Sequence, residues 1–223
     1  YFVELNSRRE KGVYFYRING YSEEVGEFIK KYYDTARRTG VVIEGKIPNP
    51  DEGNLAYYNE IMGMDFQMSM DFIHVSLRKW LPRMNEFQRQ NVAASIYDSL
   101  DSLRKAGKTE NMLRNAYIKF MCWLYYKFER IVNQLGENNI PKILYEGSIS
   151  NYELMLISIL SNAGCDVVLL QYAGDGGYLK SDPESVLSDC LPMDGLASFP
   201  QGYCIRKVRD DIQNEFNNER NIT

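Results

Sequence analysis

The stretch PKILYEGSISNYELMLISILSNAGCDVVLL, residues 141–170, decides the fold of this chain. Its two ends, 141–145 and 166–170, are short apolar runs, and the second is apolar at almost every position, as in strands buried on both faces of a parallel sheet. Between them Ser150 and Glu153 have the spacing of a capping box at the start of a helix, and Gly164 suits its end. The pattern predicts a strand, a helix over 151–163 and a second strand that lies parallel and adjacent to the first.

The first 50 residues predict a similar arrangement. Residues 1–5 and 13–18 are rich in aromatic and β-branched residues, which is typical of strands, and a hairpin is one way to join them. Ser22 can cap the helix that follows, and Gly40 suits a left-handed position at its end. Residues 41–44 are then predicted to form the next strand.

The middle of the chain, residues 51–138, is predicted to be helical because its apolar residues recur at intervals of three and four. Thr109 is expected to cap one long α-helix of about 40 Å, which Gly136 closes. The fold class is therefore α/β, with a Rossmann-like parallel sheet and a substantial helical region in the middle of the chain. We expect one compact domain, a fragment of a longer protein, made of an N-terminal segment, the helical region, a strand–helix–strand unit and a polar tail: 1–50, 51–138, 139–200 and 201–223.

The composition argues against several classes of protein. Hydrophobic residues make up 44% of the chain and charged residues 25%, which are ordinary globular values. The net charge of −4 argues against a nucleic-acid-binding protein, which needs a basic face. We interpret the basic residues that share one predicted helix as a solvated helix face: Lys30, Lys31, Arg37 and Arg38. No apolar run reaches the roughly 20 residues of a membrane span and no signal segment is recognisable, so a cytoplasmic location is expected.

Cysteine and histidine usage does not predict a metal site. The single histidine, His74, and the absence of a Cys-x-x-Cys motif make a zinc site improbable and weaken any Ser-His-Asp scheme. We expect Cys122 to be buried and all four cysteines to be free thiols, rather than Cys190 paired with Cys204.

Two loops leave the carboxyl ends of the predicted strands, where open parallel sheets bind ligands. In the first loop Gly147 allows a close backbone approach, and the helix start beside Ser150 favours an anion. The residues predicted to bind a ligand are Glu146, Gly147, Ser148, Ser150, Asn151, Gly174 and Asp175. The structural alternative is that Gly147 and Ser150 only make a turn and a cap, and that Asp175 belongs to a glycine-rich turn. Glu146 and Asp175 would be an acid/base couple if they lay close together, but no catalytic residue, metal or cofactor is assigned.

Four segments resemble the YceG-type family: WLPR at 80–83, NAYIKFMCWLYYKFER at 115–130, ILYEG at 143–147 and SNYEL at 150–154. The similarity extends over roughly residues 75–190. Proteins of this family accompany bacterial tellurite-resistance and stress-response gene clusters and are longer than this chain. The resemblance implies a component of a biosynthetic module that makes or modifies a nucleotide-like metabolite, and it carries over no catalytic residue.

The sequence leaves three functions open. The first is a ligand-binding domain, enzymatic or not, that acts on a phosphorylated or nucleotide-like small molecule in a stress-resistance system. The second is a non-catalytic module whose aromatic helices dock other proteins of the same gene cluster, and a weaker third is a glycosyltransferase-like domain. The first predicts polar groups concentrated at 146–151 and 173–177, whereas the second predicts a large exposed aromatic patch between residues 55 and 135.

Overall fold

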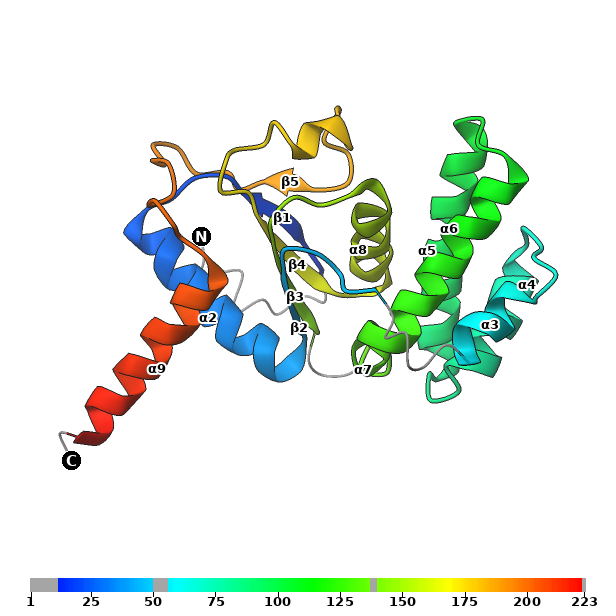
Figure 1. Cartoon of the computed structure of the whole chain (residues 1–223), viewed down its shortest axis with the longest axis horizontal. Coiled ribbons are helices and arrows are strands. Elements are labelled where there is room, and N and C mark those ends of the chain that lie inside the picture. Colours follow the sequence, from blue (N-terminus) through cyan, green and yellow to red (C-terminus); the bar gives the residue numbers. More distant parts are fainter. Residues whose placement is uncertain (1–11, 50–55, 137–139, 222–223) are drawn as a thin grey trace. The chain divides into compact units, whose positions relative to one another are not determined.

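A computed structural model of the chain describes residues 12–49, 56–136 and 140–221 (Figure 1). The chain divides into two compact units. The sheet unit comprises residues 1–46, 142–149 and 166–223, and the helical unit comprises residues 47–141 and 150–165. The four-part division expected from the sequence stays a prediction.

The sheet unit contains a five-stranded sheet in which every pair of neighbouring strands is parallel. The strand order is β2-β3-β4-β1-β5. The strands are β1 (Phe15–Ile18), β2 (Val41–Glu44), β3 (Lys142–Glu146), β4 (Asp166–Leu170) and β5 (Asp189–Cys190). As predicted, β3 and β4 are adjacent and parallel, and every residue of β4 is buried. The α/β class with a parallel sheet is thus confirmed, whereas the two-residue β5 was not predicted.

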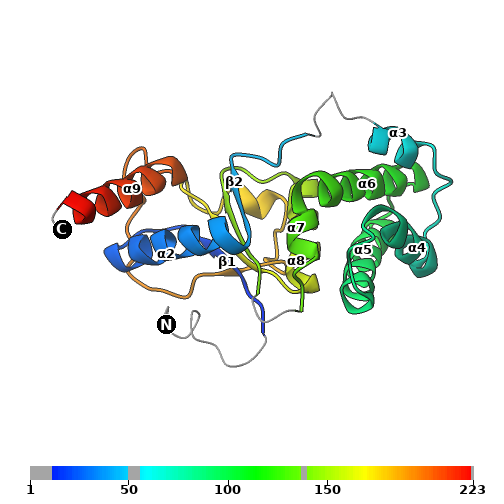
Figure 2. The same ribbon diagram turned by 90° about the horizontal axis from the view of Figure 1, so that it is seen from below.

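Two helices of the sheet unit, α2 (Glu23–Thr39) and α9 (Ile205–Asn221), pack against each other (Figure 2). Ser22 caps α2 as predicted, since its side chain accepts a hydrogen bond from the backbone N–H of Val25. The polar tail expected after residue 200 contains α9, a helix that the sequence pattern did not predict. Ile205 and Val208 are buried in the core of the unit, and Ile212 packs against it, because their spacing places all three on one helical face.

Gly40 ends α2 for a different reason from the one predicted. Its φ of −150° and ψ of −141° are not left-handed. A Cβ atom at this position would lie 1.7 Å from the carbonyl oxygen of Lys142, so only glycine lets the start of β3 approach this closely. The strand and hairpin predicted at residues 1–5 lie outside the described residues.

The helical unit consists of α3 (Ala56–Met62), α4 (Met70–Trp80), α5 (Glu86–Lys105), α6 (Glu110–Trp123), η1 (Leu124–Phe128), α7 (Glu129–Val132) and α8 (Asn151–Ala163). Helix α5 packs against α4, α6 and α8. Among the described residues, none of the helices combines the length and the hydropathy needed to span a bilayer.

The long α-helix expected after Thr109 is interrupted. Thr109 does cap α6, but η1 is a π-helix and α7 resumes the α-helical geometry. The apolar spacing could not show this change, because the buried residues still recur every three or four positions through the π-helix: Phe120, Leu124, Phe128, Ile131.

Candidate functional site

Glu146, at the end of β3, is bound by the protein's own groups. Its Oε2 accepts a hydrogen bond from the Tyr172 hydroxyl at 2.5 Å and one from the backbone N–H of Ile205 at 2.8 Å. Ile205 is the first residue of α9, so the carboxylate satisfies a free N–H group at that helix start. Burial, followed by the hydrogen bond to Glu146, raises the pKa of Tyr172 well above its usual value, so this hydroxyl remains a donor.

Gly147 serves the turn that follows β3. Its φ of +103° belongs to the left-handed region, and an added Cβ would lie 3.1 Å from the Cα of Gly45. Its carbonyl accepts a hydrogen bond from the Gln171 side chain at 3.1 Å. Replacing Gly147 with valine would therefore strain the backbone of this turn. A loss of ligand binding in that variant would not show that Gly147 contacts the ligand. Ser148, the next predicted site residue, is exposed.

Ser150 forms the predicted capping box with Glu153. The Ser150 Oγ accepts from the backbone N–H of Glu153 at 3.4 Å, and Glu153 Oε2 accepts from the backbone N–H of Ser150 at 2.9 Å. The other oxygen of Glu153 accepts from the backbone N–H of Ile47 at 2.7 Å. Ser150 and the exposed Asn151 belong to the helical unit, whereas residues 146–148 belong to the sheet unit.

Asp175 is the counter-ion of a buried arginine. Its Oδ2 lies 3.2 Å from Nη2 and 3.3 Å from Nε of Arg17, a β1 residue that is only 2% exposed. Arg17 also donates to the carbonyl and hydroxyl of Ser188 and lies 4.2 Å from the ring centroid of Tyr178. Asp175 thus helps to hold the loop between β4 and β5 on the sheet, while Gly174 provides a left-handed turn beside it. Glu146 and Asp175 bond to separate partners, so nothing supports an acid/base couple.

Aromatic side chains fill the space beyond the carboxyl ends of β1 and β4. Tyr21 and Tyr172, which follow these two strands, pack against Phe199 and Tyr203 with ring centroids 4.9 to 5.7 Å apart. Backbone hydrogen bonds between Tyr21 and Ala197 attach the segment that carries Phe199 and Tyr203 to the residues after β1. These side chains therefore occupy the part of the usual ligand-binding edge of an open parallel sheet that lies beyond β1 and β4.

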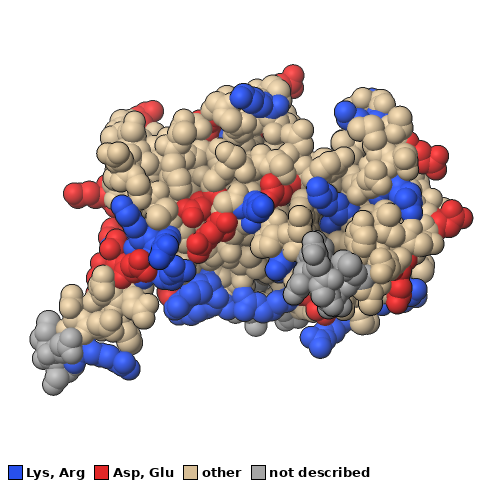
Figure 3. Space-filling model, viewed as in Figure 1, with Lys and Arg blue, Asp and Glu red and all other residues tan. Residues whose placement is uncertain are grey.

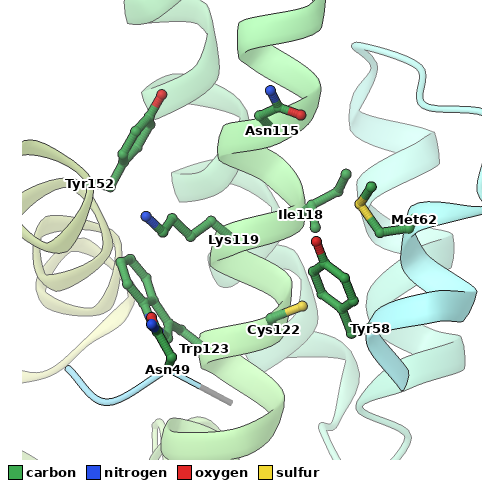
Figure 4. A pocket seen from close by; sticks show the side chains of 9 residues that line it. All are labelled: Asn49, Tyr58, Met62, Asn115, Ile118, Lys119, Cys122, Trp123 and Tyr152. Atoms are coloured by element: carbon green, nitrogen blue, oxygen red, sulfur yellow. The ribbon is translucent and has the colours of Figure 1, made fainter. Parts of the chain in front are cut away.

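The helical unit contains a cavity of about 490 Å³ beside α6 (Figure 4). Its lining comes from the segment before α3 and from α3, α6 and α8: Asn49, Tyr58, Met62, Asn115, Ile118, Lys119, Cys122, Trp123 and Tyr152. This site is not evident in the sequence, because α6 has the wide apolar face of a core helix. One signal was present, since Asn115 and Lys119 are four residues apart and lie on the side of the helix that carries Trp123.

The cavity combines aromatic rings with one positive charge. The exposed Lys119 places its ammonium 5.2 Å from the ring centroid of Trp123 and 5.1 Å from that of Tyr152. Within the part of the chain that the structure describes, Lys119 forms no ion pair, and no carboxylate lines the cavity. The other polar side-chain groups of the lining are the amides of Asn49 and Asn115, the hydroxyls of Tyr58 and Tyr152 and the indole N–H of Trp123. An apolar pocket with a few polar groups is typical of sites for small molecules.

A family model for the YceG domain matches residues 2–209. The chain belongs to the YceG domain family. The resemblance seen over residues 75–190 is thus confirmed, and it extends across both units. Every residue that lines the cavity and every predicted site residue falls within the YceG domain. No curated protein and no solved structure matches the chain.

Cys122 contributes to the YceG domain by packing. Burial raises the pKa of its thiol to about 11, so the thiol is protonated at neutral pH and is a poor nucleophile. Its burial and the free state of all four cysteines confirm the predictions made for them.

The π-helix η1 begins directly after Trp123. π-Helical turns inside α-helices are rare and occur frequently at functional sites. In this chain the π-helix lies next to a residue of the cavity, which favours the cavity over the sheet as the candidate site.

The basic residues of α2 form the solvated face that the sequence indicated. Lys30 pairs with Glu215 at 2.8 Å and with Glu27 at 3.5 Å, and Asp34 pairs with both Arg37 and Arg38. Figure 3 shows basic and acidic side chains mixed over this part of the sheet unit. Such pairs stabilise a helix surface.

Proposed function

We propose that the cavity beside α6 binds a small anionic molecule that carries an aromatic ring, of the phosphorylated or nucleotide-like type. The observation that carries this proposal is the Lys119 ammonium, which faces an aromatic cavity whose described lining holds no negative charge. The volume of about 490 Å³ lies within the range of roughly 300–1,000 Å³ found for small-molecule sites.

The energetics of Lys119 favour an anion. A cation–π contact at an exposed site contributes only about 0.5–1 kcal/mol. A hydrogen bond to a charged group contributes about 1.5–3 kcal/mol. The two ring contacts together contribute about 1–2 kcal/mol, so a phosphate or carboxylate that accepts more than one hydrogen bond from Lys119 would bind it more strongly than the rings do.

The lining supports the binding of a ligand and assigns no reaction to the site. Its described residues include no histidine and no carboxylate to act as a general base, and the Cys122 thiol is protonated at neutral pH. The family resemblance suggests that the ligand belongs to a stress-response system such as tellurite resistance. A binding role for residues 146–151 and 174–175 stays a prediction, and the partners of Glu146, Ser150 and Asp175 favour the structural alternative.

The test begins with a thermal-shift screen of nucleoside monophosphates, sugar phosphates and aromatic carboxylates, followed by calorimetry on the compounds that raise the melting temperature. Lys119→Met should weaken binding at least tenfold, which corresponds to about 1.4 kcal/mol. Lys108→Met is the matched control, because Lys108 is an exposed lysine of the same unit outside the cavity. The proposal fails if no compound binds, or if both variants bind as tightly as the parent.

Docking of other proteins on the aromatic helices has less support. Of the aromatic side chains described between residues 55 and 135, Tyr58 and Phe87 are exposed, and Tyr58 belongs to the cavity. Others pack among themselves, as in the cluster of Phe66, Phe72 and Tyr117. Partner proteins from the same gene cluster and a cytoplasmic location remain predictions from the sequence.

A further inference from the structure

The ammonium of Lys119 lies against two rings that come from different helices. Its Nζ is 5.2 Å from the ring centroid of Trp123 on α6 and 5.1 Å from that of Tyr152 on α8. Lys119 and Trp123 are four residues apart, which places them on the same face of α6. Figure 4 shows the lysine side chain reaching from α6 toward both rings.

The rings are held in place, whereas the lysine is not. Trp123 is only 4% exposed. Tyr152 is half-buried, and its ring packs at 6.5 Å, edge to face, against the fully buried Phe120. Lys119 is exposed and has a flexible four-carbon stem. The two rings therefore form a preorganised surface, and Lys119 is the part that can move when a ligand enters.

Building on the proposed function, we infer that the ring of the ligand replaces the Lys119 ammonium on the faces of Trp123 and Tyr152, while Lys119 moves to the ligand's phosphate or carboxylate. An aromatic ring gains apolar contact area from the two faces as well as stacking. The ammonium exchanges weak contacts with the rings for a charge-assisted hydrogen bond. The site consequently selects molecules that carry both a flat ring and an anionic group.

Three related probes separate the two contributions: adenosine 5′-monophosphate has the ring and the anion, adenosine has the ring alone, and ribose 5-phosphate has the anion alone. We expect the parent protein to bind the monophosphate at least tenfold more tightly than either of the other two. In Lys119→Ala the monophosphate should bind at least tenfold more weakly. Adenosine should bind at least twofold more tightly, because no ammonium has to leave the rings.

The response of adenosine to Lys119→Ala decides the displacement step. An unchanged or weaker affinity for adenosine overturns it, since a lysine that anchors the anion from a fixed position does not compete with the ring. Lys108→Ala, in the same unit and outside the cavity, should leave all three affinities unchanged. Urea denaturation of Lys119→Ala checks that this exposed position does not alter folding.

Tryptophan fluorescence gives a second, independent readout. The chain has two tryptophans, so Trp80→Phe leaves Trp123 as the single reporter. The monophosphate and adenosine should quench its emission, and ribose 5-phosphate should not. Trp123→Phe, which retains only Trp80 on α4, should show no quenching with any probe.

The outcomes for the two proposals are distinguishable. Binding of the monophosphate without quenching of Trp123, or with ribose 5-phosphate bound equally well, overturns the inference on the ring and leaves the proposed function standing. If the three probes and an aromatic carboxylate such as anthranilate all fail to bind, the proposed function falls, and the inference falls with it.

Discussion

The buried and half-buried charges at the strands and strand ends of the sheet unit have internal partners, whereas Lys119 in the helical unit faces a cavity. Asp175 pairs with Arg17, Glu146 binds Tyr172 and the start of α9, and the buried Asp166 binds Lys142 and the backbone of Tyr14. Among the described residues, the ammonium of Lys119 forms no ion pair and lies over two aromatic rings. A polar residue beside a glycine at a strand end is thus insufficient evidence for a ligand site. Such a residue is a good candidate for ligand binding only if no other group of the protein already pairs with it.

The reason is energetic. A buried or half-buried charge is costly unless it is paired, so the fold tends to satisfy it. A ligand that approached Glu146 or Asp175 would have to compete with a partner that is already in place. A ligand in the cavity displaces only weak contacts with two rings.

The largest effect should come from breaking the ion pair in the sheet unit. Arg17→Met leaves Asp175 without its counter-ion and Ser188 without its donor. Removing one partner of a buried ion pair typically lowers the free energy of unfolding by about 3–5 kcal/mol. Urea denaturation measures this loss, and adding Asp175→Asn to Arg17→Met should recover part of it. A loss below about 1 kcal/mol, the value of a surface pair, would show that this interaction is not structural.

A smaller loss is expected at Glu146. Glu146→Ala removes an acceptor for the Tyr172 hydroxyl and for the first N–H group of α9, and we expect about 1.5–3 kcal/mol from the loss of hydrogen bonds to a charged group. Glu44→Ala is the control at the same sheet edge. Glu44 is exposed and forms only a 3.5 Å pair with Arg209, so its loss should cost below about 1 kcal/mol.

Glu146→Ala also tests whether the ligand binds in the cavity or at the sheet edge. Glu146→Ala should bind any ligand of the cavity as tightly as the parent does. If calorimetry instead shows that binding is lost while the free energy of unfolding is unchanged, Glu146 is a binding residue, and the sheet edge is the site.

The smallest effect is expected for the pH dependence of stability that arises from the hydrogen bond between Glu86 and His74, the single histidine of the sequence. His74 Nε2 lies 2.8 Å from Glu86, and this hydrogen bond, with smaller contributions from the charge of His74 and from Arg89, lowers the pKa of Glu86 from its ordinary value of 4.5. A carboxylate whose pKa is lowered by folding contributes stability above its unfolded pKa, and this contribution is lost as the pH falls through the folded value.

Glu86→Gln lacks that contribution at every pH. The difference in free energy of unfolding between parent and variant should be present above about pH 5 and should shrink as the pH falls from about 5 to about 3. The change should be slight, because the Glu86 side chain is exposed to solvent. Urea denaturation across this range measures it, and a difference that stays constant with pH would show that the carboxylate charge contributes nothing.

Features that depend on neighbouring residues were predictable from the sequence. Ser150 and Glu153 cap a helix through hydrogen bonds across three residues, and the apolar run 167–170 of β4 indicates burial on both faces. Together they predicted two adjacent parallel strands and the α/β class. The segments around α6, β3 and the start of α8 also carried the family resemblance that the comparison confirmed.

The tertiary structure alone decided which polar residues are satisfied and where a cavity remains. Arg17 and Asp175 are 158 positions apart, and Tyr58, Lys119 and Tyr152 come from three helices, so no local spacing brings either set together. Gly40 shows the same limit, because its glycine is required by the backbone of a strand that begins 102 residues later. Periodicity and capping are local interactions that a sequence displays directly. Long-range contacts depend on how the elements pack, and that packing is what leaves Lys119 beside two aromatic rings and gives Asp175 its arginine.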